Sequence, residues 1–168
     1  MTDLPDPSEE GAWRELRLLQ AEMDADIARL YEEAAIPGIR PSFVGELLRL
    51  HHRGPMTIGE LAASLDRTHS AASQKVAALR AAGLVRTVPG ADARSKRVVL
   101  TQRAEAIVDR LAAEWRATEA TVAELEAEIP YPLQQVVRDL RTALARRSFH
   151  DRILDRLRED PAWHSDTH

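Results

Sequence analysis

The spacing of apolar residues along the chain predicts a mainly helical protein. Through most of the sequence, apolar side chains recur every three or four residues, which is the period of one face of an α-helix. Alanine, leucine, arginine and glutamate dominate the composition, and all four are strong helix formers. The pattern predicts helices over residues 13–34, 43–50, 58–65, 69–82, 102–129 and 133–157.

Helix breakers and capping residues separate these segments. Glycine and proline breaks lie at residues 37–38, 54–55, 83 and 130–132. Thr57 and Glu60 have the spacing of a capping box, in which the Thr hydroxyl and the Glu carboxylate each accept a hydrogen bond from a free backbone amide. Ser42 and Thr101 are expected to cap the helices that follow them.

One segment departs from the helical period. Two short runs rich in valine, Val85–Val88 and Val98–Leu100, flank a turn that contains Pro89 and Gly90. Runs of this composition on either side of such a turn are typical of a β-hairpin. We therefore expect one hairpin within an otherwise helical protein.

The charge distribution singles out the same region. The chain has a net charge of −4, yet residues 67–103 hold eight basic residues and one acidic residue, Asp92. A charged run by itself is most often a solvated face. This run covers the hairpin and the helix before it. The motifs in these two elements therefore decide whether the basic residues form a solvated face or a binding surface.

The helices at 58–65 and 69–82 are joined by a tight turn and form a candidate helix-turn-helix. The face of the second helix expected to point to the core holds Ala72, Val76, Leu79 and Gly83. The opposite, slim face holds Ser70, Gln74, Ala77, Ala78 and Ala81. A slim helix fits the major groove of DNA, where Gln pairs with adenine and Ala methyls contact thymine methyls. Taken alone, the face agrees equally well with an alanine-rich helix that has no partner.

A basic hairpin directly after a helix-turn-helix makes a winged helix, and this favours DNA. Narrow minor grooves concentrate negative potential, which attracts an inserted arginine. Arg94 is the candidate for the tip of the wing, with Asp92 orienting its guanidinium. Arg86 and Arg97 on the strands suit phosphates. The hairpin is then basic because it lies against a duplex.

The order of these elements resembles the MarR-type transcriptional regulators, a family of dimeric winged-helix proteins. The resemblance covers residues 13–157, and its most specific part runs from Leu84 through Asp92 and Arg94 to Thr101. Further matching residues are Gly54-Pro55, Leu61-Ala62, Leu65, Leu79 and Gly83-Leu84. The resemblance implies that the helix from His69 is the recognition helix, that Arg94 enters the minor groove, and that Asp92 supports it.

The predicted fold class is therefore mainly α with a small β-hairpin wing. A winged helix-turn-helix domain is expected at 41–101, and a helical dimerisation lobe at 11–40 and 102–158. Residues 1–10 are expected to form a disordered tail and residues 159–168 a frayed one. Apolar residues from Ala104 to Ile129 alternate in steps of four and three, the heptad pattern of helices that pack along their length.

The predicted function is a cytoplasmic, sequence-specific DNA-binding regulator, and the resemblance favours a repressor. A homodimer would place two recognition helices about one turn of DNA, ~34 Å, apart on a pseudo-palindromic operator. The residues expected to contact DNA are Thr68, His69, Ser70, Ser73, Gln74, Lys75, Arg86, Asp92, Arg94, Lys96 and Arg97.

The resemblance also implies a small aromatic or anionic effector between the two lobes. Residues near that junction in the family order are Arg14, Tyr31, Arg49, His51 and His52. Each is equally well explained as a structural or surface residue, so no ligand-binding residue is assigned. The effector, the operator sequence and the regulated genes do not follow from the sequence.

Other classes of function find little support. The chain has no cysteine, which excludes disulfides, Cys-based zinc sites and thiol switches. Its six histidines form no HExxH motif and are interpreted as surface or helix-end residues, so no metal is expected. No nucleophile motif or phosphate-cradling loop is present, so no catalytic residue and no cofactor are expected. No apolar run reaches the ~20 residues of a membrane span, and the acidic N-terminus is unlike a signal peptide. The alternative to a DNA-binding regulator is a helical ligand-binding or protein-interaction protein.

Overall fold

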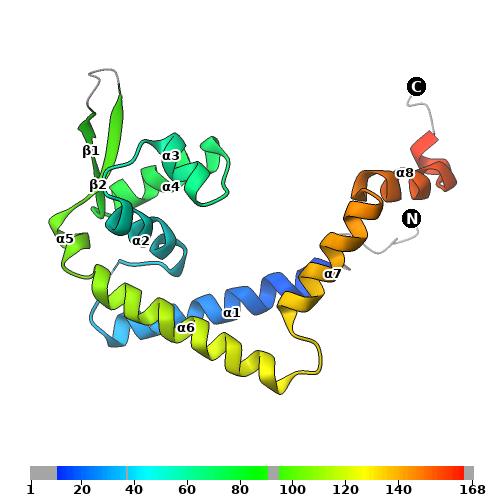
Figure 1. The fold of residues 1–168 in the computed structure, drawn as a ribbon, viewed down its shortest axis with the longest axis horizontal. Coiled ribbons are helices and arrows are strands. Elements are labelled where there is room, and N and C mark those ends of the chain that lie inside the picture. Colours follow the sequence, from blue (N-terminus) through cyan, green and yellow to red (C-terminus); the bar gives the residue numbers. More distant parts are fainter. Residues whose placement is uncertain (1–10, 37, 91–94, 165–168) are drawn as a thin grey trace, which may run out of the picture. The chain divides into compact units, whose positions relative to one another are not determined.

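The fold is mainly helical with one β-hairpin, as predicted. The structure is a computed structural model that describes residues 11–36, 38–90 and 95–164. It divides into two compact units, Met1–Arg116 and Ala117–His168 (Figure 1). The elements in chain order are α1 (Ala12–Glu33), η1 (Pro41–Phe43), α2 (Val44–Arg53), α3 (Ile58–Ser64), α4 (His69–Ala81), β1 (Val85–Pro89), β2 (Lys96–Leu100), α5 (Gln102–Glu105), α6 (Val108–Glu128), α7 (Leu133–Arg146), α8 (Phe149–Glu159) and η2 (Pro161–His164).

The first unit is built around one hydrophobic core. Each of its helices and the hairpin contribute buried apolar side chains, which shield one another from water. The leucines with no exposed surface are Leu47 in α2, Leu61 in α3, Leu79 in α4, Leu84 before β1 and Leu111 in α6. The hairpin and the helix-turn-helix therefore share one core.

Three predicted helix ends in this unit are confirmed: the start of α3 and the ends of α2 and α4. The Thr57 hydroxyl accepts from the Glu60 amide at 3.1 Å, and the Glu60 carboxylate accepts from the Thr57 amide at 2.7 Å. These two bonds are the predicted capping box of α3. Gly54 and Gly83 follow α2 and α4 with φ of 75° and 70°, a conformation that glycine adopts without the strain of a Cβ.

Two hydrogen bonds join α1 to the first turns of α6 within the same unit. The buried Tyr31 hydroxyl donates to the Glu114 carboxylate at 2.7 Å. Burial, and then the hydrogen bond to Glu114, raise the pKa of Tyr31 well above its ordinary value. Arg110 donates to the backbone oxygen of Ala34 at 2.6 Å, just past the end of α1.

The second unit exposes much of its apolar surface. None of the residues of α7 and α8, which are all described, is buried. The heptad pattern of α6 starts in the first unit's core, with Val108 and Leu111 buried, but later positions are open, with Leu125 and Ile129 each 49% exposed. Exposed apolar residues continue through the second unit at Leu133, Val136, Val137, Leu140, Leu144, Phe149 and Ile153.

Both long helices predicted after the hairpin are interrupted. The first ends as α5 and restarts as α6, because the Ile107 amide bonds to the Ala104 oxygen three residues back. The second divides into α7 and α8, where the Ser148 hydroxyl accepts from the Asp151 amide at 3.1 Å and starts a new helix. Side-chain hydrogen bonding of the Asp151 carboxylate with Ser148, and then with His150, lowers the pKa of Asp151.

Ser42 does not cap a helix, contrary to expectation. It lies within η1, and the residue at the cap of α2 is Phe43, which makes no side-chain capping bond. Part of the predicted frayed tail, Pro161–His164, is the 3-10 turn η2. The predicted disordered tail, residues 1–10, lies outside the described residues, and the grouping of helices into a dimerisation lobe stays a prediction.

Candidate nucleic-acid interface

A helix-turn-helix is formed by α3 and α4. The turn between them is held by backbone bonds from Leu65 and Arg67 to the Ala62 oxygen, at 3.2 and 2.9 Å. Asp66 takes a positive φ of 52°, a conformation in which short polar residues such as Asp are tolerated. Thr68 then caps α4, its hydroxyl oxygen accepting from the Ala71 amide at 3.2 Å. This Thr68 oxygen is a predicted DNA contact that also has a structural role.

Helix α4 has the two faces expected from its sequence. Ala72, Val76 and Leu79 are buried against the core. Gly83 was also predicted to face the core, but it is exposed. It follows the end of α4 with a positive φ and does not pack against the core. On the outer side, Ser70, Gln74, Ala77 and Ala81 are exposed, and Ala78 is half-buried. The outer face therefore remains open to a partner.

The C-terminal end of α4 is held by residues that follow the hairpin. Arg103 donates to the Ala82 oxygen at 2.8 Å, and the Thr101 hydroxyl donates to the Gly83 oxygen at 2.8 Å. A cation at this end also complements the partial negative charge of the helix terminus. With the Thr68 cap at the other end, both ends of α4 are fixed.

The hairpin is antiparallel, with Val85 opposite Leu100 and Pro89 opposite Lys96. Its second strand has another neighbour, because Val98 exchanges two backbone hydrogen bonds with Met56, between α2 and α3. Val98 and Leu100 are buried and attach the strand to the core, and Lys96, on the same face at the start of β2, is exposed. The wing is thus anchored at its base and exposes a cation farther along the same face.

The structure distributes the predicted DNA contacts unevenly. His69, Ser70, Gln74, Arg86 and Lys96 are exposed. Ser73 and Lys75 are half-buried, and the Lys75 ammonium lies 5.6 Å from the centre of the Phe43 ring. Asp92 and Arg94 lie outside the described residues. All of these contacts stay predictions.

Arg97 is used within the protein. Its guanidinium donates to the Pro55 oxygen at 2.8 Å and to the Glu60 carboxylate at 3.3 Å. The backbone amide of Thr57 and then its hydroxyl, with a smaller effect of Arg97, lower the pKa of Glu60. The structure thus gives Arg97 a role that its position on a basic strand did not reveal.

A hollow of about 170 Å³ lies between α4 and the hairpin. Ser73 and Arg80 reach it from α4, Thr87 from β1 and Lys96 from β2. Two hydroxyls and two cations of separate elements therefore face one space. Arg80 was not among the predicted contacts, although it belongs to the basic segment on which the prediction rested.

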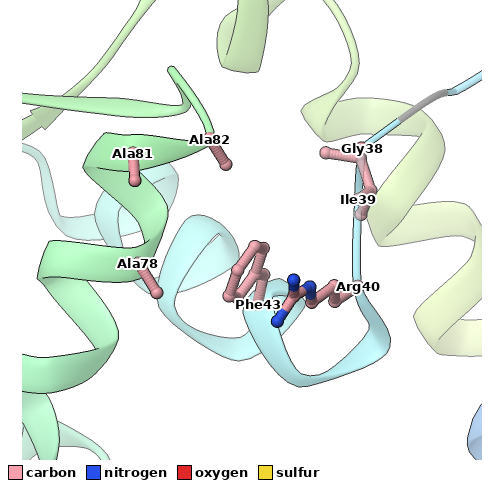
Figure 2. A pocket seen from close by; sticks show the side chains of 7 residues that line it. All are labelled: Gly38, Ile39, Arg40, Phe43, Ala78, Ala81 and Ala82. Carbon is pink, nitrogen blue, oxygen red and sulfur yellow. The ribbon is translucent and has the colours of Figure 1, made fainter.

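A larger pocket of about 510 Å³ lies between the α1–α2 connection and the C-terminal half of α4. Figure 2 shows Phe43 and Arg40 next to each other on one side, with the alanines of α4 facing them. The Arg40 guanidinium carbon is 5.7 Å from the centre of the Phe43 ring. None of the sequence candidates for effector binding lines this pocket, and no motif in the sequence marked it.

Neither metal binding nor membrane insertion gains support. Among the residues that the structure describes, no three His, Asp or Glu side chains are grouped so as to hold a metal ion. Within the same ranges, no helix has both the length and the apolar composition needed to cross a membrane.

The comparisons with known proteins agree with this geometry. A model of a helix-turn-helix domain matches residues 43–88. A comparison with curated protein sequences finds no significant match. Three solved structures share the fold over most of the chain.

The first is MepR of S. aureus in complex with DNA, at 20% identity and a TM-score of 0.57, covering 82% of this chain and 96% of that one. The second is a MarR protein of Peptoclostridium difficile, at 16% identity and a TM-score of 0.54, covering 87% and 90%. The third is the transcriptional regulator MOSR of M. tuberculosis in complex with DNA, at 26% identity and a TM-score of 0.53, covering 82% and 99%. Given this shared fold and the helix-turn-helix match, the protein is a transcriptional regulator with the winged-helix fold of the MarR type.

Proposed function

We propose that the protein binds duplex DNA in a sequence-specific manner, as a homodimer on a pseudo-palindromic operator, and represses transcription in the cytoplasm. The observation that carries the proposal is the hollow between α4 and the hairpin. Its hydroxyls and cations come from the helix and from both strands, which matches a DNA backbone that passes between a recognition helix and a wing. The two solved complexes of similar fold contain DNA, which supports the same partner here.

The dimer is supported by the exposed apolar residues. Leu140 and Leu144 in α7 are 44% and 40% exposed, and Ile153 in α8 is 41% exposed. A helix that leaves its apolar face in water gains stability when that face is buried against a partner. The heptad spacing of α6 fits helix-to-helix packing, so a second copy of this chain is the partner we propose.

A small effector is supported by the pocket at Arg40 and Phe43. An aromatic ring beside a guanidinium suits an aromatic anion, because Phe43 can pack against the ring of the ligand while Arg40 pairs with its negative charge. The pocket is lined by Ala78 and Ala81 of α4 and by Ala82, which directly follows the helix. A ligand there would press on the recognition helix and bias its position, which lowers affinity for DNA if the two states differ in how tightly they hold the ligand.

The test is equilibrium binding of the purified protein to the DNA upstream of its own gene, by fluorescence anisotropy at several salt concentrations. We expect tighter binding than to random DNA. Log affinity should fall with log salt by roughly 0.9 for each phosphate neutralised. Arg80→Ala and Arg94→Ala should each weaken binding. Arg116→Ala, an exposed arginine on α6, serves as a control of equal charge and should change it little.

The outcomes separate the proposals. If neither this DNA nor any duplex from a random-sequence selection is bound at low salt, DNA binding is wrong and a protein or ligand partner takes its place. If operator DNA is bound equally well by Arg94→Ala, only the assignment of the wing fails. Repression is checked separately, by transcription in vitro from the bound promoter with and without the protein.

A further inference from the structure

Helix α2 carries a charged side chain in an apolar setting. Glu46 is 1% exposed, and its helix also buries Val44, Leu47 and Leu50. Neither carboxylate oxygen has a hydrogen-bond partner among the residues that the structure describes. A carboxylate removed from water in this way is unfavourable unless another group compensates its charge.

Arg67 supplies that compensation from the turn before α4. Its Nε lies 3.5 Å from the Oε1 of Glu46, an ion pair that is too long and too poorly aligned to be a hydrogen bond. The Arg67 side chain is 44% exposed, although its partner is buried. One end of the guanidinium thus faces a fixed negative charge, while the side chain also reaches solvent.

The rest of the guanidinium remains available. A guanidinium has five N–H donors, and only Nε is close to Glu46. Within residues 11–36, 38–90 and 95–164, the Arg67 guanidinium has no second partner besides Glu46. An arginine held at Nε presents its two outer nitrogens as a planar fork, which matches two oxygens of a phosphate.

The location of Arg67 matches this chemistry. The residue directly precedes Thr68, the cap of α4, so it lies at the N-terminal end of the recognition helix. His69 and Ser70 beside it are exposed. The partial positive charge of a helix N-terminus adds to the attraction for an anion at this end.

We infer that Arg67 binds a phosphate of the DNA backbone and that the buried Glu46 is the positioning residue that aims it. This inference rests on the proposed DNA binding. A lysine at position 67 would not serve both purposes, because one ammonium cannot face Glu46 and also offer a planar fork. Glu46 thereby converts a side chain that would move freely into one that is already oriented before DNA arrives.

The experiment uses the double variant Glu46→Leu/Arg67→Met in the full-length protein. It removes one negative and one positive charge, so the net charge is unchanged. Glu46 is buried among apolar residues, where Leu fits, and Arg67 is half-exposed, where Met is tolerated. Removing both charges together leaves no uncompensated buried carboxylate, so the variant should melt at the same temperature as wild type or higher. Arg67→Met alone leaves Glu46 uncompensated and should melt lower, which is why the double variant carries the test.

The readout is the salt dependence of DNA affinity. For the double variant, we expect the slope of log affinity against log salt to become shallower by roughly 0.9 for each phosphate that the protein no longer neutralises, or roughly 1.8 for a dimer. Affinity should fall by a similar factor for operator and random DNA, because binding to a phosphate carries no sequence information. A folded double variant with the wild-type slope would show that Arg67 does not bind phosphate.

Glu46→Gln tests the positioning role. This variant makes the protein more positive by one charge, which by itself would strengthen DNA binding. We expect weaker binding with the salt slope retained, because Arg67 is still present but no longer aimed. Equal or tighter binding would overturn the role of Glu46. If wild type binds no duplex at low salt, the proposed function fails and this inference with it, whereas a steep wild-type slope with unaltered variants overturns the inference alone.

Discussion

Arg97 on strand β2 and Glu60 in helix α3 are joined by a hydrogen bond of 3.3 Å. The same carboxylate oxygen accepts from the Thr57 amide at 2.7 Å, so one oxygen caps α3 and holds the wing. Arg97 also donates to the Pro55 oxygen at 2.8 Å. The base of the wing is therefore attached to the start of the helix-turn-helix.

Replacing Arg97 should affect stability more than replacing a surface arginine does. Arg97→Ala should lower the free energy of unfolding by about 1 kcal/mol, because it removes the bond to Pro55, while the partly exposed pair with Glu60 adds little. Urea denaturation followed by circular dichroism measures this difference.

Arg86→Ala is the matched control, since Arg86 is exposed on the neighbouring strand. Its effect on unfolding should stay within about 0.5 kcal/mol. Its effect on DNA affinity should exceed its effect on stability, as expected for a residue that binds phosphate. Equal losses of stability in the two variants would show that the internal bonds of Arg97 contribute nothing.

The capping box should make stability depend on pH. The backbone amide and the hydroxyl of Thr57 lower the pKa of Glu60 below its ordinary value of 4.5, because they stabilise the ionised form. Ionised Glu60 therefore contributes to the free energy of unfolding above about pH 4.5. This contribution is lost as the pH falls through the lower pKa that Glu60 has in the folded state. The free energy of unfolding should thus differ most between wild type and Glu60→Gln near pH 7. The difference should shrink toward pH 3, as measured by urea denaturation across this range, and a constant difference would contradict the assignment.

Two glycines of the same helix region should respond in opposite directions to alanine. Gly54 has φ 75° and ψ −157°, a backbone region open to glycine almost alone, so Gly54→Ala should destabilise by about 1–3 kcal/mol. Gly45 lies inside α2, and a Cβ there meets nothing within 4 Å. Gly45→Ala should stabilise by up to about 1 kcal/mol. Melting temperatures of the two variants give the signs, and a loss at Gly45 would show that its helix position is not the deciding factor.

The oligomeric state should depend on the apolar residues of α7. Leu140→Glu places a charge on a residue that is 44% exposed in the single chain, so it should leave the helices intact and shift the protein toward monomer. Sedimentation velocity measures the change. Arg141→Glu adds a carboxylate at the neighbouring exposed position and should leave the dimer in place. A wild-type monomer at all concentrations would contradict the proposed dimer.

Local rules account for the features that the sequence predicted correctly. Three such features are the capping box at Thr57 and Glu60, the helix end at Gly83 and the hairpin that starts at Val85. Each is set by interactions between residues that are close in the sequence. The two faces of α4 follow from the helical period. The start of α8 is also set locally, because Ser148 caps it. The sequence prediction missed this cap because the apolar period continues through it and predicts a single helix over residues 133–157.

By itself, then, the sequence determined the helical class, the hairpin, the helix-turn-helix and its open face. Only the tertiary structure decided which charges remain free for a partner. Arg97 bonds to Pro55 at a separation of 42 residues, and Arg67, in the turn before α4, pairs with Glu46 in α2. Lys75 lies over Phe43, and Arg80 shares a hollow with Lys96. The physical reason is that a long basic side chain can reach many partners, and chain packing alone selects among them.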